Sequence, residues 1–181
     1  MTDALYPQET GVRQTNFQMN YLDEVAETIR DDAIAQARKK LGAARPREDL
    51  DSLLNRLDFF DYFKYGLASG VVNVLTSYDP YVQAVYLYDP SANPDDETVG
   101  ELLRDASVHL HVLVTAQTLE LMALISAFDR ALTASLKELP SSRFAQRDSI
   151  LDVNLITGED VRCGAVLSGI FASPLKIWQR E

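Results

Sequence analysis

Both histidines of the chain lie two positions apart, as His109 and His111, inside the hydrophobic segment 107–114. Side chains alternate between the two faces of a β-strand, so a strand here presents both imidazoles on one face and valine and leucine side chains on the other. Imidazole exchanges protons near neutral pH and is a common ligand for transition metals. We therefore expect any chemistry of this protein to take place on that strand face.

The spacing of hydrophobic residues predicts the elements that position this strand. The predicted helices cover residues 20–41, 46–78, 97–104, 118–139 and 157–170. The predicted strands cover residues 81–88, 107–114, 150–156 and 175–178. Residues 1–19 have no periodicity, and we expect a loose tail there.

This order of elements predicts a mixed α+β protein of the α/β type, in which helices pack on one mixed sheet. Residues 1–78 would supply an N-terminal tail and helices that pack on an α/β core of residues 79–181. A length of 181 residues suits one such structural unit.

Composition excludes several classes of partner. With 27 acidic residues against 17 basic ones, the formal net charge of −10 opposes binding to nucleic acid. No run of residues approaches the roughly 20 apolar positions of a membrane span, and Met1–Asn20 does not resemble a signal peptide. A single cysteine, Cys163, fits a reducing compartment. We therefore expect a cytoplasmic protein.

A strand ending in Leu87-Tyr88, a second strand with two alternating polar residues, a long helix and a third strand with one carboxylate follow one another in this chain. The arrangement resembles the nucleotidyltransferase superfamily, especially its minimal and kanamycin-nucleotidyltransferase-like members. The matching segments are residues 82–92, 107–114 and 150–161. The resemblance implies a nucleotidyltransferase-like mixed sheet flanked by helices, with an N-terminal helical extension, and an ancestral site for Mg²⁺ and a nucleoside triphosphate.

The motifs of that family are altered here. Where the family has a Gly-Ser turn for phosphate, this chain has Asp89 and Pro90, with Ser91 one position late. Asp89 would repel phosphate, and Pro90 lacks a backbone N–H donor. The family's Asp-x-Asp pair aligns with His109 and His111. Neutral imidazoles do not supply the anionic oxygens that Mg²⁺ prefers, so we expect the standard transfer reaction to be absent.

The resemblance brings Asp152 and Asn154 of the third strand to the same sheet face as the two histidines. The leading interpretation is a pseudoenzyme without a cofactor, which binds a small ligand or a protein. One alternative is a metal-dependent enzyme, because two imidazoles and one carboxylate suit Zn²⁺, Mn²⁺ or Fe²⁺. A second alternative is an active nucleotidyltransferase with a rebuilt site. The apolar surface of the N-terminal helices also predicts a homodimer.

Overall fold

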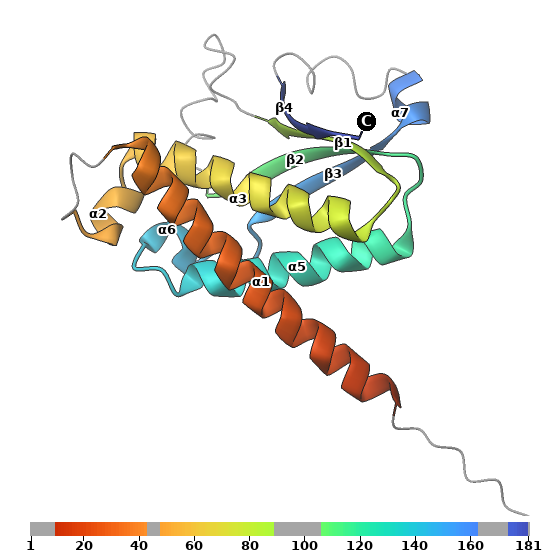
Figure 1. Ribbon diagram of the computed structural model, residues 1–181, viewed down its shortest axis with the longest axis horizontal. Helices are drawn as coiled ribbons and strands as arrows, with labels where there is room; N and C mark the ends of the chain where they lie inside the picture. The colour runs from red at the N-terminus through yellow and green to blue at the C-terminus, as the bar shows by residue number, and fades with distance from the viewer. Residues whose placement is uncertain (1–9, 43–47, 89–105, 163–173, 181) are drawn as a thin grey trace, which may run out of the picture.

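The computed structural model describes residues 10–42, 48–88, 106–162 and 174–180. Its helices are α1 (Thr10–Lys40), α2 (Leu50–Leu54), α3 (Leu57–Tyr78), α5 (Leu119–Lys137), α6 (Ser142–Ala145) and α7 (Gly158–Arg162). Its strands are β1 (Val82–Tyr88), β2 (Val108–Val114), β3 (Leu151–Thr157) and β4 (Pro174–Gln179). The protein is mixed α+β, as the periodicity predicts (Figure 1).

The four strands form one mixed sheet in the order β3-β2-β1-β4. β1 is antiparallel to both β2 and β4, whereas β2 and β3 are parallel. A parallel pair needs a crossover connection, and here α5 lies between β2 and β3 in the chain. β3 therefore forms one edge of the sheet and β4 the other.

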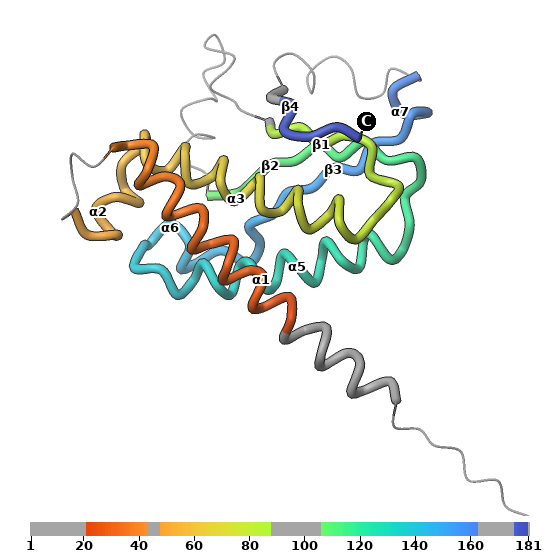
Figure 2. The backbone as a smooth tube through the Cα atoms, viewed as in Figure 1, coloured from red at the N-terminus to blue at the C-terminus, as the bar shows by residue number. Residues whose placement is uncertain are grey.

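Helices α1, α3 and α5 lie on one side of the sheet (Figure 1). α3 contacts β1, β2 and β4, while α1 contacts α3 and crosses α5 (Figure 2). The face of β2 that carries Val108, Leu110, Val112 and Val114 is buried. One hydrophobic cluster joins these side chains to buried residues of α1, α3 and α5, so the N-terminal helices share a core with the sheet.

Two glycines bring α1 and α3 into close contact. A Cβ atom on Gly66 would lie 2.9 Å from both Cα and Cβ of Ala33. A Cβ atom on Gly70 would lie 2.4 Å from Cγ2 of Ile29. The lack of a side chain at these two positions therefore allows α1 and α3 to pack closely.

The N-terminal helix begins earlier than predicted. α1 starts at Thr10, so the prediction of a loose tail is wrong for residues 10–19, and residues 1–9 lie outside the described part of the chain. Once a helix is nucleated, each added residue contributes a hydrogen bond, so a segment without apolar periodicity can extend a helix that is anchored further along.

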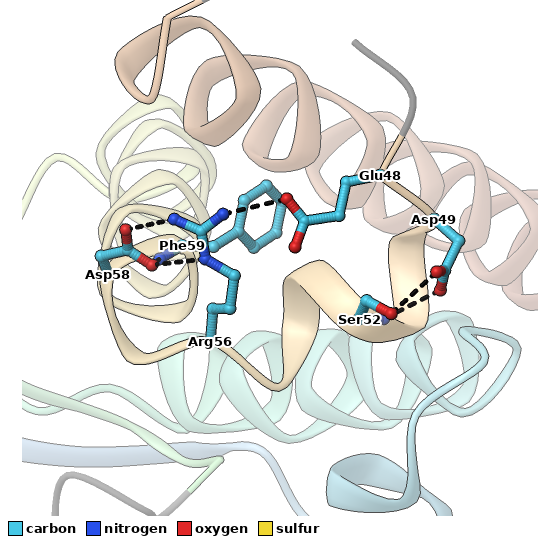
Figure 3. Close-up of polar contacts among 6 residues, drawn as sticks. All are labelled: Glu48, Asp49, Ser52, Arg56, Asp58 and Phe59. Atoms are coloured by element: carbon cyan, nitrogen blue, oxygen red, sulfur yellow. Dashed lines mark hydrogen bonds and ion pairs between the residues drawn. The ribbon is translucent and has the colours of Figure 1, made fainter. Parts of the chain in front are cut away.

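The single helix predicted over residues 46–78 is in fact two helices, α2 and α3, with a turn between them (Figure 3). The backbone of Arg56 is extended there, with φ −85° and ψ 133°. Its guanidinium Nη1 lies 3.0 Å from Oε2 of Glu48, and its Nε lies 3.0 Å from Oδ1 of Asp58. At the N-cap of α2, the carboxylate of Asp49 accepts a backbone hydrogen bond. These polar contacts stabilise a break that the apolar spacing does not reveal.

Two further differences concern short helices. α6 was not predicted; Ser141 caps it, and it places Phe144 in the core. Residues 97–104 and most of the helix predicted over 157–170 lie outside the described residues, apart from α7. The predicted edge strand at 175–178 is confirmed as β4. No helix in the described ranges is long and apolar enough to span a bilayer.

Candidate functional site

The parallel pairing of β2 and β3 sets the candidate residues opposite one another. His109 is opposite Asp152, and His111 is opposite Asn154. Directly paired residues share a sheet face, so all four side chains lie on the face opposite to the helix-covered valines and leucines. His109 and His111 are partly buried, whereas Asp152 and Asn154 are exposed on the edge strand.

His109 and Asp152 are bonded to each other. The distance between Nδ1 of His109 and Oδ2 of Asp152 is 2.8 Å. A neutral imidazole that donates from Nδ1 to a carboxylate keeps its lone pair on Nε2, and in His109 that Nε2 atom is buried. The carboxylate therefore orients the ring, and in a neutral imidazole it favours the tautomer that is protonated on Nδ1.

His111 differs from His109 in its electrostatic setting. Burial lowers the pKa of His111, because desolvation disfavours the charged imidazolium. The nearby carboxylate of Asp152 opposes this effect on the pKa, and His109 would add to it in its protonated form. We therefore expect His111 to be neutral at pH 7, as a hydrogen-bonding group without charge.

The row that contains His111 continues across the whole sheet. Tyr86 of β1 is opposite His111, and Lys176 of β4 is opposite Tyr86. With Asn154 on the other side, four polar side chains therefore form one row over four strands. We call the six residues of this surface the polar face: Tyr86, His109, His111, Asp152, Asn154 and Lys176.

On the same face of the sheet, the row beside that of His111 is apolar on the three strands β1, β2 and β3. Leu113 is opposite Ala84 on β1 and Ile156 on β3, and both of these neighbours are buried. The polar side chains of the His111 row therefore lie beside a row whose apolar members are buried or half-buried.

Sequence reasoning missed Tyr86 and Lys176. The alternating segment 81–88 shows that Tyr86 and Val85 lie on opposite faces, but not which strand is the neighbour. β4 is separated from β1 by more than 80 residues in the chain, so only the tertiary pairing brings Lys176 beside Tyr86.

The metal site of the alternative interpretation does not form a ligand cluster within the described residues. There, no group of three or more His, Cys, Asp or Glu side chains is arranged to hold a metal ion. His109, His111 and Asp152 share a face without forming such a cluster. The hydrogen bond to Nδ1 gives Asp152 the position of a residue that orients a histidine.

The positions of the altered phosphate turn, Asp89, Pro90 and Ser91, lie outside the described residues, directly after the end of β1. Comparison with models of known protein families, with characterised proteins and with solved structures finds no match to this chain. The function of this chain is therefore inferred from the geometry of the polar face.

Proposed function

We propose that this chain is a catalytically degenerate nucleotidyltransferase-fold protein that uses its polar face to bind a ligand. The hydrogen bond between His109 and Asp152 is the observation that supports the proposal most directly. In the resemblance, Asp152 is the one carboxylate left of the metal-binding set. Here its Oδ2 atom lies within hydrogen-bond distance of an imidazole.

Nucleotidyl transfer needs hard, anionic oxygen atoms to hold Mg²⁺. The other two positions of the family's metal-binding carboxylates are occupied here by the imidazoles of His109 and His111. Burial also favours the neutral form of His111. Its other groups are the Tyr86 hydroxyl, the Asn154 amide and the Lys176 ammonium. These groups suit the hydrogen-bonding edge of a small polar molecule better than a pair of divalent cations.

We also propose a cytoplasmic homodimer that does not bind nucleic acid, in keeping with the net charge of −10. From Tyr21 onward in α1, and along α3, most aliphatic side chains and the phenylalanines are buried within the chain, which leaves exposed tyrosines for self-association. These are Tyr21, Tyr62, Tyr65 and Tyr78. Light scattering after size-exclusion chromatography tests the dimer. A monomer mass at every concentration up to ~100 μM, well above the Kd of a stable dimer, would overturn it.

Loss of transfer activity is tested with the full chain, each of the four ribonucleoside triphosphates, and Mg²⁺. We expect the wild-type protein to release no more pyrophosphate than the Asp152→Ala variant does. Release by the wild-type protein that disappears in Asp152→Ala would overturn the proposal in favour of an active enzyme with a rebuilt site.

Ligand binding is tested by NMR on tag-free protein, whose two histidines give only two imidazole Cε1–Hε1 signals. The probes are inorganic phosphate, pyrophosphate, and nucleoside mono- and triphosphates, all without metal. We expect at least one probe to shift both signals saturably, and Asn154→Ala to weaken that shift. Lys137→Ala, an exposed change at the end of α5, is the matched control. If no probe moves either signal, binding of phosphates and nucleotides at the polar face is overturned.

A further inference from the structure

We infer that Asp129 of α5 is a positioning residue that holds β3 in register and so places Asp152 against His109. The inference rests on the proposed function in one respect, which is that it takes His109 and Asp152 as part of the binding site. The carboxylate atom Oδ1 of Asp129 accepts hydrogen bonds from the backbone N–H groups of Ile150, at 2.9 Å, and Leu151, at 2.8 Å. A helix side chain therefore bonds the first residues of an edge strand.

The start of β3 is held from two directions. The backbone carbonyl of Ile150 accepts a hydrogen bond from the backbone N–H of Val108 on β2, at 2.7 Å. The N–H of the same residue points to Asp129. Ile150 is thereby fixed between β2 and α5, two residues before Asp152.

Register matters here because side chains alternate with a period of two. A slip of β3 by one residue would turn Asp152 to the helix-covered face and set a hydrophobic neighbour opposite His109. Asp152 is exposed on an edge strand, so its own surroundings constrain it little. The contacts of Asp129 supply this constraint from a partly buried position, where Thr133 also donates a hydrogen bond to Oδ1, at 3.3 Å.

The sequence shows Asp129 only as a charge that interrupts the apolar stretch 119–136. The structure shows its contact with β3. Helix α5 connects β2 to β3, and Asp129 on this helix lies beside the start of β3. In the described part of the chain, Asp129 makes no hydrogen bond to either histidine. Its effect on the site passes through the β3 backbone.

The test compares Asp129→Ala and Asp129→Asn with the wild-type protein by the imidazole ¹⁵N shifts of His109, which report the ring tautomer. We expect the Ala variant to lose the Nδ1-protonated signature of His109. The Asn variant should give intermediate shifts, because a neutral amide oxygen accepts hydrogen bonds more weakly than a carboxylate. His111, on the same strand but opposite Asn154, is the internal reference and should move less than His109.

Asp148 is an exposed acidic residue two positions before Ile150, so Asp148→Ala is the matched control and should leave the His109 shifts unchanged. Wild-type His109 shifts in either Asp129 variant would overturn the inference, as would equal changes at His109 and His111. If the Ala variant does not fold, the Asn variant decides by the same criterion. No ligand is added, so the result does not depend on whether the proposed binding function holds.

Discussion

His109 and Asp152 face each other across the parallel β2–β3 pair, with 2.8 Å between Nδ1 and Oδ2. Only 20% of the His109 side chain is exposed, against 70% for Asp152. Water screens the charge of such an exposed carboxylate, so the bond adds little to stability. Its main consequence is the orientation and tautomer of a partly buried imidazole.

Replacing Asp152 with Asn is expected to change the tautomer of His109 and to leave the fold intact. An amide can donate as well as accept, so it no longer selects Nδ1 protonation. We expect the imidazole ¹⁵N shifts of His109 to indicate a mixture of tautomers, while the free energy of unfolding changes by less than about 1 kcal/mol. Glu159→Gln, an exposed acid-to-amide change on α7, is the control. Unchanged ¹⁵N shifts would contradict the assigned hydrogen bond.

His111 is expected to make stability depend on pH. Burial lowers its pKa below the ordinary value of 6.5, so the unfolded chain takes up a proton at a higher pH than the folded chain does. The free energy of unfolding should therefore fall as the pH drops below about 6.5 and level off below the folded pKa of His111. Urea unfolding of the wild-type protein and of His111→Gln between pH 5 and pH 8 measures this difference. Parallel curves for the two proteins would contradict the prediction.

Gly70→Ala and Gly66→Ala are expected to destabilise the contact between α1 and α3. The added methyl group would overlap Ile29 in the first variant and Ala33 in the second. Overpacking of this kind costs about 1–3 kcal/mol in the free energy of unfolding, against a gain of about 1 kcal/mol in helix propensity from Gly to Ala. We therefore expect a net loss of up to about 2 kcal/mol. Ser69→Ala, one residue away on α3, is the control, and urea unfolding is the measurement; a stabilised Gly70→Ala protein would refute the close packing.

Transition metals are expected to bind only weakly to the polar face. Within the described ranges, His109 and His111 lack a third side chain that completes a ligand cluster. We therefore expect Zn²⁺, Mn²⁺ and EDTA to leave Tm unchanged, and elemental analysis to find less than one metal ion per chain. Stoichiometric metal that is lost in both His109→Ala and His111→Ala would establish the metal-dependent alternative instead.

The local sequence pattern predicts the strand that carries the histidines, because alternation along 107–114 is a property of neighbouring residues. It likewise predicts α5 and β3, where the apolar spacing is regular. It does not predict the break between α2 and α3, since the apolar face of the helix continues through the break. At the break, the extended backbone of Arg56 is accompanied by contacts of its guanidinium with Glu48 and Asp58.

By itself, then, the sequence determined the mixed α+β class and the strand face on which both histidines lie. Only the tertiary structure decided what surrounds them: the bond from His109 to Asp152, the row that adds Tyr86 and Lys176, and the contacts of Asp129 with the start of β3. The physical reason is that periodicity records which face of its own element a side chain occupies. Strand order and register depend on contacts between residues far apart in the chain.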